Sequence, residues 1–138
     1  LVEASKNRWS GANTQVYARG MLVAFLADLA VLRKSKGENS VEQVLREVYQ
    51  KHRRPGARTD GNEAVLSILA ARMELRPVIE KYIKGTQNID WQTDLEFFGI
   101  ESATENFATK LKVKSKLSNR QKDLLDKLGY NNWGKRSR

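Results

Sequence analysis

The sequence predicts an all-α fold, in which an array of about six short helices surrounds one buried central helix. The stretch 16–32 indicates the central helix, because it is apolar nearly all round and only Arg19 and Asp28 carry charge. The two prolines favour helix over sheet, as do the many Ala, Leu, Glu, Lys and Arg residues. Alternating Val, Ile and Thr runs are nearly absent. At 138 residues, the chain is long enough for one hydrophobic core.

The central helix is too short to cross a bilayer, which needs roughly 20 apolar residues, and Asp28 interrupts it, so no membrane partner is expected. Gly20 costs about 1 kcal/mol relative to Ala in a helix interior, so we expect a backbone or a ligand to approach closely there. Asp28 is expected to be a buried or half-buried partner of a neighbouring arginine. Arg33 and Lys34, followed by Gly37, predict the end of the helix.

Shorter helices are predicted after this one. Ser40 and Gln43 have the spacing of a capping box, so a helix should begin at Ser40. Its apolar residues recur at helical spacing and form one face: Val41, Val44, Leu45, Val48 and Tyr49. Asn62 is expected to cap the next helix, Pro77 to open a fourth, and Asp90 to cap a fifth.

The last part of the chain has a different pattern. Leu111, Val113 and Leu117 alternate with lysines, which predicts a short β element near residues 111–117 with its lysines outward. Ser118 and Gln121 repeat the capping-box spacing and predict a final short helix. The chain is therefore divided into a helical domain over 1–109 and a basic C-terminal extension over 110–138.

The charge is unevenly distributed between these two parts. The net charge is +9, yet residues 1–109 hold 15 basic and 14 acidic side chains, whereas residues 110–138 hold 10 basic and 2 acidic ones. A nearly neutral body with a strongly basic extension raises the question of an acidic partner.

Local motifs identify no enzyme. There is no cysteine, and His52 is the only histidine, whereas zinc motifs need at least two His or Cys ligands at defined spacing. No nucleophile elbow, phosphate-binding glycine loop or paired-carboxylate cluster is visible. No cofactor is therefore expected to be held by this chain.

One ordered series of segments resembles a known family. It consists of Val16-Tyr17-Ala18-Arg19-Gly20 before the long apolar helix, the stretch 40–49, Tyr82-Ile83-Lys84-Gly85-Thr86, and the stretch 94–100. Together they cover roughly residues 5–101 and resemble the helical part that follows the zinc site in the glycyl aminopeptidase family of gluzincin-type metallopeptidases, which often carry a PDZ module. The likeness to membrane-alanyl-type aminopeptidases is more distant.

The resemblance implies a role for Tyr17. In that family a helix upstream carries a His-Glu-x-x-His pair and a further Glu completes the zinc shell; neither is in this chain, which is expected to be inactive alone. Zinc is implied for a longer parent protein, which Leu1 in place of an initiator methionine also suggests. Tyr17 corresponds to the catalytic tyrosine, whose phenol, with a pKa of about 10, donates a hydrogen bond to the oxyanion. The implied partners are the upstream zinc-binding part and a peptide substrate.

Two other interpretations stay open. The chain could be a non-catalytic helical interaction module whose basic tail, residues 110–116 and 135–138, binds nucleic acid or another acidic partner. Nucleic acid is not the favoured partner, because aromatic residues are few in this tail and its lysines alternate. In the third interpretation the chain is a helical scaffold without a site, and Tyr17 is a core aromatic whose hydroxyl finds a structural partner.

Overall fold

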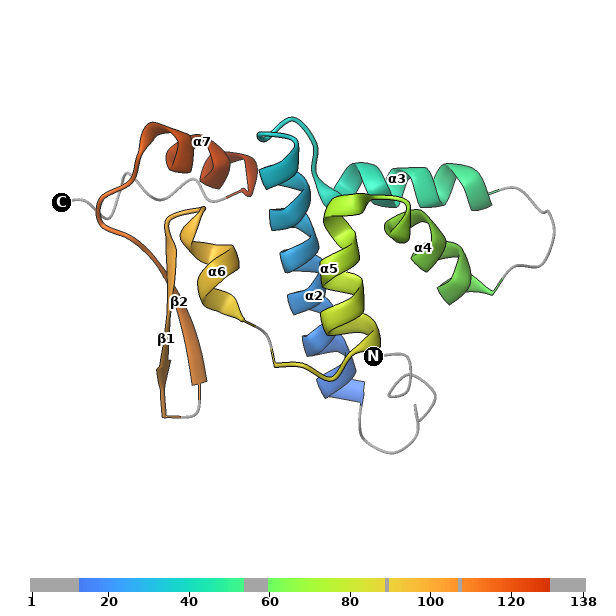
Figure 1. Ribbon diagram of the computed structural model, residues 1–138, viewed down its shortest axis with the longest axis horizontal. Helices are drawn as coiled ribbons and strands as arrows, with labels where there is room; N and C mark the ends of the chain where they lie inside the picture. The colour runs from blue at the N-terminus through green and yellow to red at the C-terminus, as the bar shows by residue number, and fades with distance from the viewer. Residues whose placement is uncertain (1–12, 54–59, 89, 107, 130–138) are drawn as a thin grey trace.

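The fold is mainly α-helical, with one small antiparallel sheet (Figure 1). The computed structural model describes residues 13–53, 60–88, 90–106 and 108–129. The elements run in the order α2 (Asn13–Lys34), α3 (Val41–His52), α4 (Gly61–Ala70), η1 (Met73–Leu75), α5 (Arg76–Val78), η2 (Ile79–Lys84), α6 (Trp91–Glu96), β1 (Ile100–Glu105), β2 (Ala108–Val113) and α7 (Asn119–Lys127). The predicted mainly helical class is confirmed.

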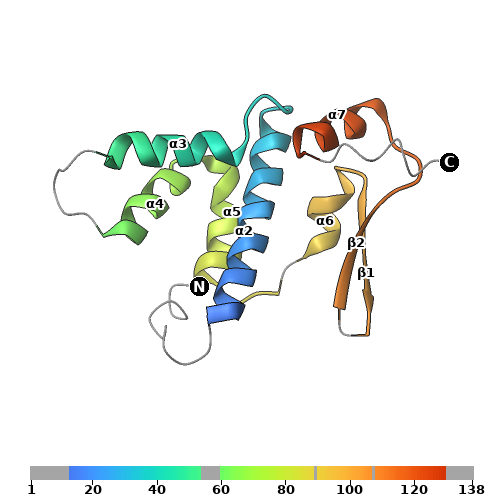
Figure 2. The same ribbon diagram turned by 180° about the vertical axis from the view of Figure 1, so that it is seen from behind.

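Helix α2 runs through the middle of the molecule in both views (Figures 1 and 2). On one side of it lie α3, α4 and the continuous run η1, α5 and η2; on the other lie α6, the β-hairpin and α7. The core is apolar and contains residues from the elements on both sides of α2. Its most deeply buried members include Leu26, Leu29, Val31, Leu32, Val44, Leu75, Leu95, Phe98, Leu124 and Leu125. The buried residues of α2 lie between Val23 and Leu32, whereas its first half is exposed at Tyr17, Met21 and Leu22, so the helix is enclosed only in part.

The C-terminus of α2 ends in a left-handed turn. The amide of Gly37 donates to the carbonyl of Leu32 at 2.8 Å, and that of Lys36 donates to Arg33 at 3.4 Å, the bond pattern of a Schellman motif. Gly37 has φ +90°, as expected for a terminating glycine, but Lys36 also has a positive φ of 56°. A side chain at this left-handed position is strained, because its Cβ approaches the backbone carbonyl.

Replacing Lys36 with glycine is therefore expected to raise the free energy of unfolding by about 0.5–1 kcal/mol, the relief of strain less the added entropy of the unfolded chain. Urea unfolding followed by circular dichroism measures the change. Lys34→Gly is the matched control, since Lys34 lies within the right-handed helix and glycine there should destabilise by up to about 1 kcal/mol. Equal effects of the two substitutions would contradict the assignment.

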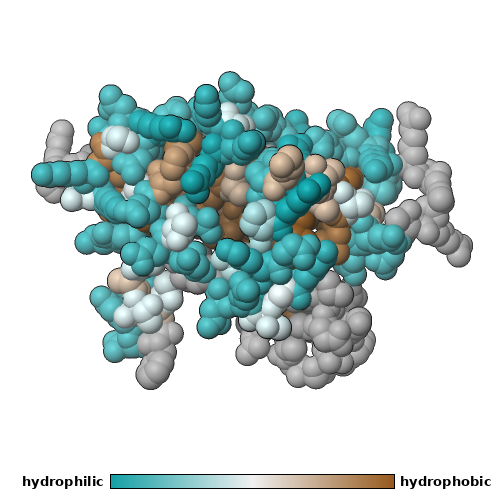
Figure 3. All heavy atoms as spheres, viewed as in Figure 1, coloured by the Kyte–Doolittle hydropathy of each residue, from teal (hydrophilic) through white to brown (hydrophobic). Residues whose placement is uncertain are grey.

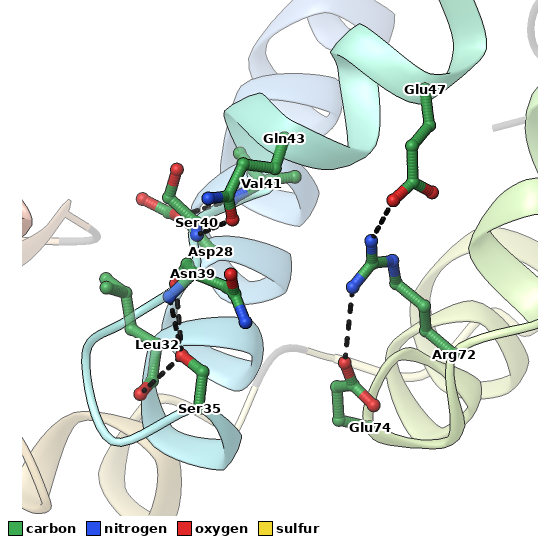
Figure 4. A network of polar contacts seen from close by, with 10 residues as sticks. All are labelled: Asp28, Leu32, Ser35, Asn39, Ser40, Val41, Gln43, Glu47, Arg72 and Glu74. Atoms are coloured by element: carbon green, nitrogen blue, oxygen red, sulfur yellow. Dashed lines mark hydrogen bonds and ion pairs between the residues drawn. The ribbon is translucent and has the colours of Figure 1, made fainter.

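Helix α3 begins at a carboxylate supplied by α2. Asp28 Oδ1 accepts a hydrogen bond from the amide of Val41 at 2.8 Å, and the amide of Ser40 donates to Gln43 Oε1 at 3.1 Å (Figure 4). The predicted helix start and the Gln43 half of the capping box are confirmed. The predicted arginine partner of Asp28 is wrong within the described residues: the first amides of a helix lack intrahelical acceptors and carry partial positive charge, which satisfies a half-buried carboxylate.

One of the other predicted helix starts is shifted. The carboxylate of Asp60, not the side chain of Asn62, caps α4, accepting from the amides of Asn62 and Glu63 at 2.9 and 3.1 Å. Pro77 lies in the first turn of α5, as predicted, although α5 follows directly on the 3-10 turn η1. Asp90 caps α6 as predicted, accepting from the amide of Gln92 at 3.2 Å.

The predicted β element is present but lies earlier in the chain and has a partner strand. β1 pairs with β2 in antiparallel register from Ile100 opposite Val113 to Glu105 opposite Ala108. The strand therefore ends at Val113, and the expected domain boundary between residues 109 and 110 lies inside β2. The outward Lys110 pairs with Glu105 at 2.7 Å. The capping box of α7 is confirmed, with Ser118 Oγ accepting from the amide of Gln121 at 3.2 Å.

Candidate functional site

Tyr17 lies in the first turns of α2 and points away from the core. It is 74% exposed, and its hydroxyl makes no hydrogen bond to a described residue. Met21, one helical turn further along the same face, is 70% exposed. The interpretation of Tyr17 as a core aromatic with a structural partner is therefore not supported by the residues that the structure describes.

Gly20 lies next to this exposed face and borders open space. A Cβ built on it would meet no atom within 4 Å, so the expected close approach of another backbone is wrong for the residues that the structure describes. The helix carries a glycine where alanine would fit and would be about 1 kcal/mol more favourable. Nothing in the described part of the chain explains that choice.

An apolar groove opens beside Gly20 between α2, α3, α4 and the η1–α5–η2 run. Its volume is about 240 Å³, and every residue lining it is apolar or glycine: Gly20, Val23, Ala24, Ala27, Val41, Leu45, Val48, Val65, Leu69, Leu75, Val78, Ile79 and Ile83. Leu45 in its wall is 57% exposed, although the sequence placed it on the buried face of α3. The groove is shaped for apolar contact and supplies no group for proton transfer.

Arg19 ties the start of α2 to the segment after η2. Its Nη2 donates to the carbonyl of Gln87 at 3.3 Å, while its buried Nε has no partner among the described residues. The side chain of Arg19 is half-buried. Arg19 thereby holds the turn that carries Tyr17.

A second cavity lies on the other side of α2 and was not expected from the sequence. This feature, the Asp94 cavity, has a volume of about 290 Å³, and its lining includes Arg33 and Lys34 of α2, Lys81 of η2 and Asp94 of α6. Arg33 and Lys34 had been interpreted only as helix-terminating charges. The sequence offered one signal: Asp94 follows Asp90 by one helical turn, which places two carboxylates close together.

Burial raises the pKa of the Asp94 carboxyl above its ordinary value, and the nearby Asp90 carboxylate raises it further; Lys81 and Arg33 act in the opposite direction. Desolvation disfavours the charged form, and a second negative charge does the same. The folded protein therefore binds a proton at Asp94 more readily than the unfolded chain does.

The stability that Asp94 contributes should accordingly be present below the ordinary aspartate pKa of about 3.9 and be lost as the pH rises through the raised value. Asp94→Asn is expected to remove this dependence, so the variant gains stability relative to the parent chain between acid and neutral pH. Urea unfolding from pH 3 to pH 7 measures it. Asp123→Asn, on exposed α7, is the control, and the same pH profile in both variants would refute the assignment.

The described residues hold no metal-binding set. No group of three or more His, Cys, Asp and Glu side chains in them could hold a metal ion. His52, at the end of α3, is exposed. No helix in the same part of the chain is long and apolar enough to cross a membrane.

Comparison with known proteins adds no identification. No family model, no curated protein and no solved structure matches the chain.

Proposed function

We propose that this chain is the C-terminal helical portion of a zinc-dependent aminopeptidase, where it forms one wall of the active-site cleft and supplies Tyr17 to stabilise the oxyanion. The proposal starts from the resemblance of four segments to the glycyl aminopeptidase family. The observation that carries it further is the position of Tyr17: its hydroxyl is exposed and free of described partners, yet it stands on the helix that forms the core.

Such a position suits a hydrogen-bond donor in catalysis. A donor stabilises developing negative charge only if it is already held where that charge forms, because reorientation would cost part of the gain. Arg19 fixes the first turns of α2 to Gln87, and the buried Val23 and Leu26 anchor the next turns. The backbone that carries the Tyr17 phenol is therefore anchored to the rest of the chain.

The exposed apolar surface near Tyr17 supports the proposal that another part of the protein packs against it. Met21 is largely exposed, Gly20 borders open space, and the apolar groove begins at Gly20. Exposed apolar patches of this kind are typical of interaction sites. The upstream zinc-binding part of the same polypeptide is the partner that the resemblance implies, and a peptide substrate would lie between the two parts.

The alternative of a basic interaction module has weaker support. In the described part of the extension, Lys110 pairs with Glu105 at 2.7 Å and Lys114 with Glu96 at 3.3 Å. Ion pairs within the chain reduce the charge that these lysines can offer to phosphates. A salt-sensitive association with DNA would favour this second function.

The test is hydrolysis of glycyl and alanyl p-nitroanilides by the complete parent polypeptide, loaded with zinc and then treated with a chelator. We expect turnover that the chelator abolishes and zinc restores. The 138-residue chain alone should be inactive. A zinc-loaded parent that cleaves neither substrate, or a parent that binds no zinc, would overturn the proposal.

A further inference from the structure

The Asp94 cavity combines an apolar floor with a charged rim. Its floor includes Leu26, Leu29 and Phe98, which are buried, together with the buried ring of Tyr82. Its charged lining residues come from four separate elements, α2, η1, η2 and α6. Apolar residues also show between polar ones over the middle of the face in Figure 3, where α2 and α5 lie. Most ligand pockets have this character, an apolar body with few polar groups.

The cations at this rim have no anionic partners within the described residues. Arg33, Lys34 and Lys81 have no described carboxylate within 4.0 Å, whereas many other cations of the chain form ion pairs. The guanidinium of Arg33 instead lies 4.9 Å from the ring centroid of Phe97. Glu74, a further lining residue, is engaged by Arg72, which bridges it to Glu47 (Figure 4).

Asp94 is then the one carboxylate of the lining that no arginine or lysine pairs within the described residues. The lining also holds three exposed cations, Arg33, Lys34 and Lys81, so it carries excess positive charge once Glu74 is counted with Arg72. The gap between Asp94 and the cations is wider than an ion pair. A ligand group that accepts hydrogen bonds from the cations fits this arrangement better than a second cation would.

We propose that the Asp94 cavity binds a small organic carboxylate with an apolar body, whose anionic group is held by Lys81 and Arg33 and whose body rests on Ala30 and Pro77. The volume of about 290 Å³ suits a molecule of roughly ten heavy atoms. Inorganic phosphate would leave the apolar floor uncovered, and an uncharged molecule would leave the cations unused. The site is separate from Tyr17 and does not depend on the proposed peptidase function.

Asp94 provides a second test of the proposal, because its carboxylate disfavours an anionic ligand. Its negative charge repels a bound carboxylate, while its neutral form can donate a hydrogen bond to one. The raised pKa of Asp94, caused by burial and by Asp90, brings that neutral form closer to neutral pH. Asp94→Asn should therefore tighten binding at pH 7, and Lys81→Gln should weaken it.

The experiment titrates the 138-residue chain with sodium hexanoate and follows amide shifts by ¹H–¹⁵N NMR. We expect saturable shifts at Ala30, Lys81 and Asp94, about fivefold weaker binding in Lys81→Gln, and tighter binding in Asp94→Asn. Lys116→Gln removes an exposed lysine outside the cavity and should bind as the parent chain does. If Lys81→Gln loses its helical circular dichroism, Arg33→Gln replaces it.

Hexan-1-ol tests the apolar body of the ligand without its charge, and inorganic phosphate tests the negative charge without the apolar body. Neither should give saturable shifts at these residues at the concentration where hexanoate does. Equal binding of hexanol, equal shifts with phosphate, the absence of saturable shifts with hexanoate, or unchanged affinity in Lys81→Gln and Arg33→Gln would each overturn the proposal.

Discussion

On the proposed function, replacing Tyr17 with phenylalanine is expected to lower kcat of the zinc-loaded parent polypeptide by about a hundredfold or more, with little change in KM. One preorganised oxyanion donor contributes roughly 3–4 kcal/mol to the transition state and much less to the ground state. The ring remains, so the apolar contacts of the exposed phenyl group are kept. Steady-state kinetics on alanyl p-nitroanilide measure the effect.

Tyr49→Phe is the matched control, because Tyr49 of α3 is also largely exposed, at 68%, but lies outside the segment that resembles the catalytic one. It should leave kcat unchanged. Zinc content and the circular dichroism spectrum should be the same in both variants. A Tyr17→Phe enzyme with parental kcat would remove Tyr17 from the reaction, even if the parent proves to be an aminopeptidase.

Replacing Leu32 with alanine is expected to lower the free energy of unfolding by about 3–5 kcal/mol. Leu32 is 1% exposed and stands at the end of the central helix, within the core that both sides of the molecule share. This loss has two contributions: the transfer free energy of the removed methyl groups, and the cost of a cavity that the packed helices cannot close. Urea unfolding of the 138-residue chain, followed by circular dichroism, gives the value.

Leu45→Ala makes the same chemical change at a position that the sequence pattern also assigned to an apolar helix face. Leu45 is 57% exposed in the wall of the apolar groove, so the Leu45→Ala substitution should lower the free energy of unfolding by less than about 1 kcal/mol. Equal losses at the two positions would show that the groove is closed in solution. A small loss at Leu45 beside a large one at Leu32 is the expected result.

The features that the sequence determined by itself are local. Residues 16–32 form the central helix, Gly37 ends it, and the capping boxes at Ser40 and Ser118 mark helix starts. These signals act within about one helical turn, since propensity, capping bonds and left-handed glycine turns involve neighbours in the chain. Such elements can therefore be recognised without knowing what packs against them.

Only the tertiary structure decided which residues meet across the chain. It brought Asp28 to the amide of Val41, paired β1 with β2, left Tyr17 and Leu45 exposed, and gathered the cations of the Asp94 cavity from separate elements. The helical period places Leu45 and Val44 on one face but does not say where the neighbouring helix stops covering it. The burial of a side chain, the pKa of Asp94 and the shape of a cavity depend on those long-range contacts, which are set by how the other elements pack around α2.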